Sequence, residues 1–214
     1  MTEIYFVKSF EDDFTTKTVI GKKKINCQTI NQILKTNTIA PNTISFGRKR
    51  RLACTLLAKE YTKTYRSQGI IFQTIQSPDY IAPFDIILLT NADKIVVQYY
   101  RIQNNLHTYY NHNLIPGADK FIFKNFQEMI KKYKKPIDTW KQINKFRVKN
   151  GFRELPKSKF KLVEYNEAIF YTIVKIKPIA IFGYKQIAKD IAIKHHLPHY
   201  ASAKLFYDKI ITKK

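Results

Sequence analysis

The sequence predicts an α+β protein with a mixed, largely antiparallel sheet, packed helices and a basic helical pair. Short β-branched runs and helical patterns follow one another irregularly, which favours α+β over a regular βαβ series. Of the 214 residues, 44% are hydrophobic and 25% are charged, as is usual for a globular domain. A chain of this length can bury one sizeable core. We therefore expect a single domain over residues 1–214 with a basic helical insertion at about 125–150.

The first third of the chain is expected to hold a strand and two helices. Ile4–Val7 is typical of a short strand, and the following helix has an apolar face made of Ile30, Ile33 and Leu34. Thr38–Ser45 resembles a loop, because Pro-Asn inside it indicates a turn. A second helix is expected after Gly47, because its apolar residues recur at helical spacing: Leu52, Leu56, Leu57 and Tyr61.

The middle of the chain is expected to be mostly strands. Ile70–Gln73 is apolar and β-branched and is bounded by Gly69. Asp85–Thr90 and Ile95–Tyr100 are separated by the turn sequence Asn-Ala-Asp-Lys, which predicts a hairpin. Lys120–Phe123 is a further short candidate strand.

Helices and strands alternate in the last ninety residues. Asn125 caps a first helix, Pro136 suits the start of a second, and Gly151 suits its end. The remaining elements are two strands and then two helices, the helices being separated by Leu-Pro: Leu162–Phe170, Ile176–Phe182, Tyr184–Lys194 and Ser202–Ile211.

Positive charge is the main indication of function. The chain has 38 Lys and Arg against 16 Asp and Glu, a net charge of +22. Residues 1–119 hold 15 basic and 9 acidic residues (+6), whereas residues 120–214 hold 23 and 7 (+16). So many like charges repel one another in a compact fold, and proteins with such an excess commonly bind a polyanion. Nucleic acid is the expected partner, and an acidic protein surface is the alternative.

Other classes of protein have little support. Cys27 and Cys54 form no CxxC or Cys/His pair, so we expect small buried hydrophobes and no metal site. We expect no signal peptide, because residues 1–10 lack a basic start and a long apolar run, and no apolar run in the sequence approaches the length of a membrane span. We therefore expect a cytoplasmic protein without a membrane span.

Four consecutive cations are a candidate phosphate-binding site. Placed at the start of the second helix, they would oppose the helix dipole unless an anion lies there. These residues are Arg48, Lys49, Arg50 and Arg51. In the alternative interpretation the helix begins after them, and they lie in a solvated loop.

The basic helical pair is the candidate nucleic-acid interface, because lysines on the polar sides of helices can contact phosphates. These lysines are Lys131, Lys132, Lys134, Lys135, Lys141, Lys145 and Lys149. The alternative is that they form a solvated face with no partner.

Glu167 is the best catalytic candidate. Strand alternation places it on a face with Val163, Tyr165 and Ile169, opposite to Glu164. A carboxylate on an apolar face either lines a cleft or is paired. The alternative is a surface or salt-bridged glutamate on an edge strand.

Three segments together resemble the ADP-ribosyltransferase fold, including toxins that modify DNA bases. They are the strand Ile70–Ile75 ending in Gln-Ser-Pro, the apolar strand Phe84–Thr90, and the late strand Tyr165–Phe170 followed by residues 174–179. The resemblance spans roughly residues 65–182. It implies NAD as cofactor and implies that Glu167 orients the nicotinamide ribose. The first-strand Arg or His of that family is absent, since this first strand reads Ile4–Lys8.

Four functions remain open at this point. The first is an enzyme that modifies nucleic acid, similar to an ADP-ribosyltransferase. The second is a non-catalytic nucleic-acid-binding module. The third is a metal-dependent nuclease that uses Asp85 with Glu164 or Glu167. The fourth is a protein-interaction factor that targets an acidic partner surface, and the sequence does not separate it from the second.

Overall fold

The computed structural model describes two large parts of the chain and several single residues between them. The first part comprises residues 4–14, 19–20, 23–24, 28–44, 50–58, 62–64 and 66–82, and the second comprises residues 166–211. The single residues are 128, 131, 141, 144, 145, 148, 149, 151, 153 and 154.

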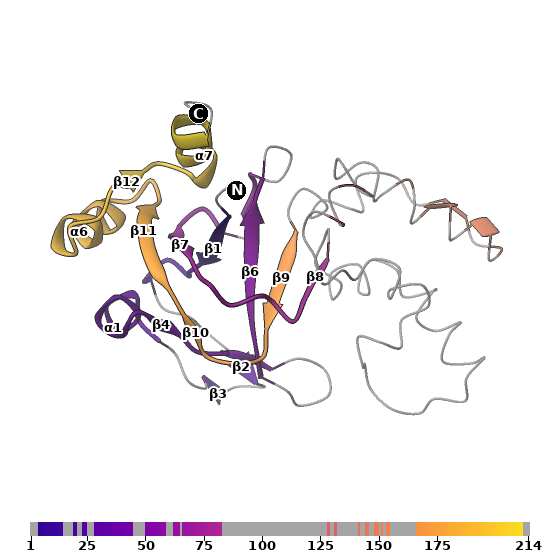
Figure 1. The fold of residues 1–214 in the computed structure, drawn as a ribbon, viewed down its shortest axis with the longest axis horizontal. Helices are drawn as coiled ribbons and strands as arrows, with labels where there is room; N and C mark the ends of the chain where they lie inside the picture. The colour runs from indigo at the N-terminus through magenta and orange to yellow at the C-terminus, as the bar shows by residue number, and fades with distance from the viewer. Residues whose placement is uncertain are drawn as a thin grey trace.

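One large sheet dominates these residues (Figure 1). Its strand order is β12-β11-β7-β1-β6-β9-β8, and β5 also pairs with β6. All of its pairings are antiparallel except that of β11 with β12, which confirms the mixed, largely antiparallel α+β fold. The strands are β1 (Tyr5–Ser9), β5 (Thr43–Ile44), β6 (Arg50–Leu57), β7 (Gly69–Gln73), β8 (Tyr80–Ala82), β9 (Glu167–Phe170), β11 (Lys177–Phe182) and β12 (His199–Tyr200).

Two small strand pairs and three helices complete the described elements. The strand pairs are β2 (Val19–Ile20) with β3 (Lys23–Lys24), and β4 (Thr38–Ile39) with β10 (Val174–Lys175). The helices are α1 (Ile30–Thr36), α6 (Gln186–Lys194) and α7 (Ala203–Ile211). A capping box formed by Thr29 and Gln32 opens α1, and Asn37 ends it in the left-handed conformation at φ 50°.

The helices pack on both faces of the sheet because its strands are apolar on both sides. On one face, Phe6, Leu56 and Phe72 pack with residues of α1 and α6. On the other face, Tyr5 and Val7 pack with residues of α7. Figure 1 shows α6 and α7 beside β11 and β12, with β8 at the opposite side of the sheet.

Several predicted elements are confirmed to within a few residues. The strands predicted at residues 4–7, 70–73 and 176–182 correspond to β1, β7 and β11. The helices predicted around residue 30, at 184–194 and at 202–211 correspond to α1, α6 and α7. Of the strand predicted at 162–170, residues 167–170 form β9, and residues 162–165 lie outside the described part.

The helix predicted after Gly47 is wrong, because Arg50–Leu57 forms the strand β6. Leu52 and Leu56 are four residues apart, which fits one helix face, but with Cys54 they also fit one strand face. Residues 51–57 are buried on both sides apart from Ala53, as expected of a strand inside a sheet. The loop predicted at 38–45 likewise contains two short strands, β4 and β5.

The basic helical pair lies largely outside the described residues. Those described there, Glu128, Lys131, Lys141, Asn144, Lys145, Val148 and Lys149, are all helical. Gly151 has φ +79°, and its N–H donates to the carbonyl of Val148 at 3.0 Å, consistent with the predicted helix end. The predicted hairpin at 85–100 and the strand at 120–123 lie outside the described residues. Within the part of the chain that is described, no helix has the length and apolarity needed to cross a membrane.

Candidate functional site

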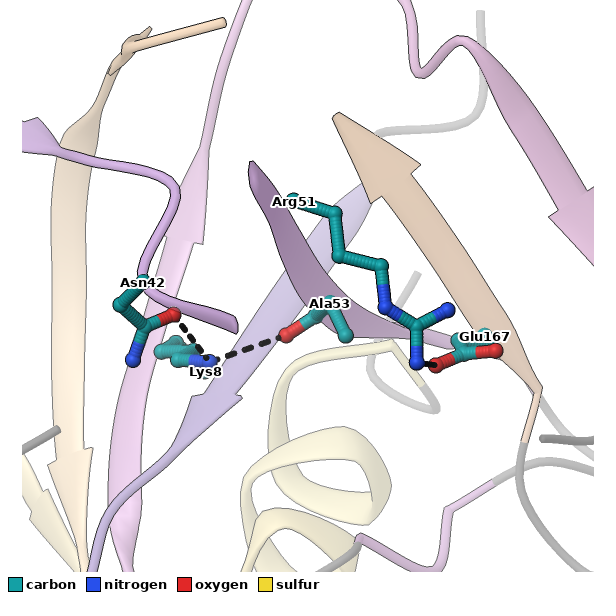
Figure 2. Close-up of polar contacts among 5 residues, drawn as sticks. All are labelled: Lys8, Asn42, Arg51, Ala53 and Glu167. Atoms are coloured by element: carbon teal, nitrogen blue, oxygen red, sulfur yellow. Dashed lines mark hydrogen bonds and ion pairs between the residues drawn. The ribbon is translucent and has the colours of Figure 1, made fainter. Parts of the chain in front are cut away.

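A buried ion pair joins two residues that the sequence analysis assigned to separate sites. Arg51 on β6 and Glu167 on β9 approach to 3.6 Å between guanidinium Nη2 and carboxylate Oε1. Their side chains are only 3% and 5% exposed. Figure 2 shows the arginine extending alongside β6, past Ala53, toward the glutamate. Both charges of this pair are therefore removed from solvent, so each depends on the other for compensation.

The strand register explains why only a long side chain makes this contact. Leu52 lies opposite Phe170, and Cys54 opposite Ala168. Extending this register by one pair places Glu167 opposite Thr55, four residues along β6 from Arg51. Alternation puts positions 51 and 55 on the same face of the strand. Four residues of strand span roughly 13 Å, a separation that Arg and Glu bridge together by lying along the sheet.

Lys8 brings another cation into the same region of the sheet, from β1 on the other side of β6. Its ammonium donates to the carbonyl of Ala53 at 3.3 Å and lies 3.5 Å from Asn42 Oδ1 (Figure 2). Desolvation by burial lowers the pKa of Lys8, and Arg51 lowers it further, whereas Cys54 and Glu167 act in the opposite direction. Glu167 is therefore within electrostatic range of two cations.

Cys54 occupies the position of β6 between Leu52 and Leu56 and is buried. Burial raises the pKa of its thiol to about 12, an effect that nearby Lys8 partly offsets. Cys54 is therefore a small core residue, as predicted, and is not a reactive nucleophile. Cys27 lies outside the described residues.

Asn166 fixes the start of β9 and hence the position of Glu167. Its side-chain amide donates to the carbonyl of Leu56 at 2.6 Å and accepts from the Leu56 N–H at 2.8 Å. The amide thus replaces one residue of backbone pairing between β9 and β6. Because Asn166 is fully buried, the loss of either bond would leave a polar group without compensation.

Three charged side chains of this region are buried and closed off from solvent: Lys8, Arg51 and Glu167. Glu167 is 4% exposed, so a substrate would reach it only if neighbouring side chains moved. The salt bridge agrees with the alternative that the sequence left open, but β9 lies between β6 and β8 and is not an edge strand.

The four-cation run does not lie at a helix start, because β6 is a strand. Arg50 is exposed and lies opposite Ile44 of β5, whereas Arg51 is buried against Glu167. The first half of the run, Arg48 and Lys49, lies outside the described residues. The physical reason for a phosphate site, a helix N-terminus with surplus cations, is therefore missing here.

The predicted nucleic-acid lysines are described in part. Lys131, Lys141, Lys145 and Lys149 are all exposed on helical backbone. Lys132, Lys134 and Lys135 lie outside the described residues, as do Glu164 and Asp85. No group of three or more His, Cys, Asp or Glu residues with metal-binding geometry occurs among the described residues.

Sequence reasoning missed Lys8, Asn42 and Asn166. Lys8 had a weak local signal, since it is the one charge inside the apolar stretch from Ile4 to Phe10. The two asparagines had none, because their partners are 34 and 110 residues away in sequence.

Comparison with protein-family models, with curated proteins and with solved structures found no match.

Proposed function

We propose that this protein binds nucleic acid through lysines of its C-terminal half. The observation that carries the proposal is the placement of three exposed lysines, Lys141, Lys145 and Lys149, on helical backbone. Residues four apart in a helix lie about 6 Å apart along the axis and 40° apart around it. On one continuous helix, three lysines at this spacing share a face that is roughly 12 Å long.

Two further observations support this proposal. Residues 120–214 carry a net charge of +16, out of +22 for the whole chain. The long-range attraction of such a charge raises association rates with polyanions. Each phosphate that a lysine then neutralises releases counterions, which favours binding. The fold's buried cations, Lys8 and Arg51, do not contribute to such a surface, so binding depends on the exposed ones.

The test is the salt dependence of duplex DNA binding, measured by fluorescence anisotropy. In duplex DNA each phosphate contact contributes about 0.9 to the slope of log K against log salt concentration. Replacing Lys141, Lys145 and Lys149 by Gln should therefore flatten the slope by up to about 3. The matched control replaces Lys189, Lys194 and Lys204, which are also exposed and in the same half.

Equal slopes for the two triple variants would contradict this interface, because net charge alone would then explain the binding. Absence of binding to duplex and single-stranded DNA and to RNA would contradict the function itself. It would leave an acidic protein surface as the partner for the excess charge.

A second candidate function is NAD-dependent ADP-ribosyl transfer to nucleic acid, with Glu167 as the catalytic carboxylate. The observation that favours it is the position of Glu167 beside Arg51 and within electrostatic range of Lys8. The guanidinium of Arg51 beside this carboxylate could hold an anionic cofactor if the pair opened to solvent. The same surface lysines would then hold the acceptor.

NAD consumption by the purified protein in the presence of DNA or RNA tests this second function. Glu167→Gln should abolish turnover while nucleic-acid binding persists, and circular dichroism establishes that the variant is folded. No turnover with any acceptor, together with no thermal shift on adding NAD, would leave a non-catalytic binding module.

A further inference from the structure

Two isoleucines are exposed at the tips of adjacent turns. Ile75 lies in the turn after β7 and is fully exposed, with a relative accessibility of 101%. Ile173 lies in the turn between β9 and β10 and is 59% exposed. A single exposed apolar residue is ordinary, but two on neighbouring turns form a local apolar projection.

The side chain of Gln76 joins the two turns directly. Its amide N–H donates to the carbonyl of Ile173 at 3.1 Å, and its amide oxygen accepts from the N–H of Lys175 at 2.6 Å. Gln76 thus pairs with the backbone on both sides of Val174, which is fully buried. The residues next to the two isoleucines are held together by these bonds.

Further hydrogen bonds restrain each turn. The hydroxyl of Thr74 accepts from the N–H of Gln76 at 3.1 Å. The carboxylate of Asp79 accepts from the N–H of Tyr171 at 2.8 Å, and its own N–H donates to the carbonyl of Ile169 at 2.7 Å. The two isoleucines are therefore presented by restrained backbone, which lowers the entropy lost when they insert into a partner.

Cations flank this projection. Lys175 follows Ile173 by two residues, and Lys177 lies opposite Gln73, where β7 ends. Both lysines are exposed. The acidic side chain of these turns is that of Asp79, and its carboxylate already accepts a backbone hydrogen bond. The surroundings therefore suit an anionic partner with an apolar interior.

We propose that Ile75 and Ile173 form a wedge that enters the base stack of a bound nucleic-acid duplex, while Lys175 and Lys177 contact the adjacent phosphates. Apolar side chains inserted between base steps partly unstack them and bend the duplex. This inference rests on the proposed nucleic-acid binding and specifies a duplex partner and a mode of contact. An anionic membrane is less suitable, because binding strength there scales with the buried apolar area, and two side chains supply little of it.

The experiment uses the full chain and a duplex that carries 2-aminopurine beside a TA step, which unstacks easily. Fluorescence of 2-aminopurine rises when its base loses stacking, and anisotropy of a dye on the same duplex reports binding. The test variant is Ile75→Ser with Ile173→Ser. The matched control is Leu205→Ser, an exposed apolar residue on α7.

The wild-type protein and the Leu205 variant should raise the fluorescence on binding, and the double variant should not. The double variant should bind about tenfold more weakly with an unchanged salt slope, because apolar contact is lost and phosphate contacts remain. Gln76→Ala, which releases the turns but keeps both isoleucines, should reduce the fluorescence rise.

Binding without any fluorescence rise, or an equal rise with the double variant, would overturn the wedge and leave nucleic-acid binding intact. Absence of duplex binding would overturn both. Ile75-dependent binding to phosphatidylserine vesicles, without a fluorescence rise on DNA, would assign the projection to a membrane instead.

Discussion

Replacing Glu167 with Gln removes the charge opposite Arg51 and keeps the shape of the side chain. At 3.6 Å and an effective dielectric constant of about 20, the Coulomb energy of the pair is about 4–5 kcal/mol. Loss of one partner from a buried pair typically costs about 3–5 kcal/mol, because the other charge stays buried. We therefore expect the free energy of unfolding to fall by about 3–5 kcal/mol.

The assay is urea unfolding followed by far-ultraviolet circular dichroism, supported by thermal melts. For a chain of this size, 1 kcal/mol corresponds to about 2–4 °C in Tm, so the melting temperature should fall by roughly 6–20 °C. The matched control is Glu11→Gln, which breaks the exposed pair of Glu11 with Arg66 at 2.8 Å. An exposed pair contributes at most about 1 kcal/mol.

Replacing Arg51 and Glu167 together distinguishes a stability loss caused by an unpaired buried charge from one caused by altered packing. Arg51→Met combined with Glu167→Met removes both charges, and such changes are often neutral or stabilising. The double variant should therefore be more stable than either single variant. An interaction of this size is absent if Glu167→Gln lowers the free energy of unfolding no more than Glu11→Gln does. It is equally absent if the effects of Arg51→Met and Glu167→Met simply add in the double variant.

Three further predictions concern the same sheet. Because burial lowers the pKa of Lys8 below 10.5, the unfolded chain holds its proton in a pH range where the folded protein has lost it, so stability should rise with pH across that range. Unfolding at several alkaline pH values should show a flatter dependence for Lys8→Met, and parallel curves would contradict this. Cys54, with its pKa raised to about 12, should resist brief alkylation at pH 8 until urea unfolds the protein, as mass spectrometry of its peptide would reveal. Gly69→Ala should cost about 3 kcal/mol in urea unfolding, because the new Cβ would lie 2.2 Å from the backbone oxygen of Lys8, and unchanged stability would refute that clash.

The elements whose apolar residues follow a single clear periodicity were predictable from the sequence. The strands β1, β7 and β11 are short β-branched runs between turn residues, and α6 ends before Leu197-Pro198 as Pro requires. Local preference and tertiary packing agree in these segments, so the pattern alone suffices. The segment Arg50–Leu57 fits both periods, because Leu52 and Leu56 share a helix face and, together with Cys54, also share a strand face. Pairing with β1 and β9 decides in favour of the strand.

The candidate site was predictable only as separate residues. Glu167 and the arginine run stood out because charged residues within or beside apolar segments are unusual. Their pairing did not, because Arg51 and Glu167 are 116 positions apart and meet only through the register of β6 with β9.

Composition and order of residues determined the α+β class, the two C-terminal helices and the large positive charge, since each depends on local preference or on simple counting. The tertiary structure decided which cations are available to a partner. It buries Lys8, buries Arg51 against Glu167, and leaves Lys141, Lys145 and Lys149 exposed. The physical reason is that solvation depends on which strands and helices pack over a side chain, and segments far apart in sequence make that packing.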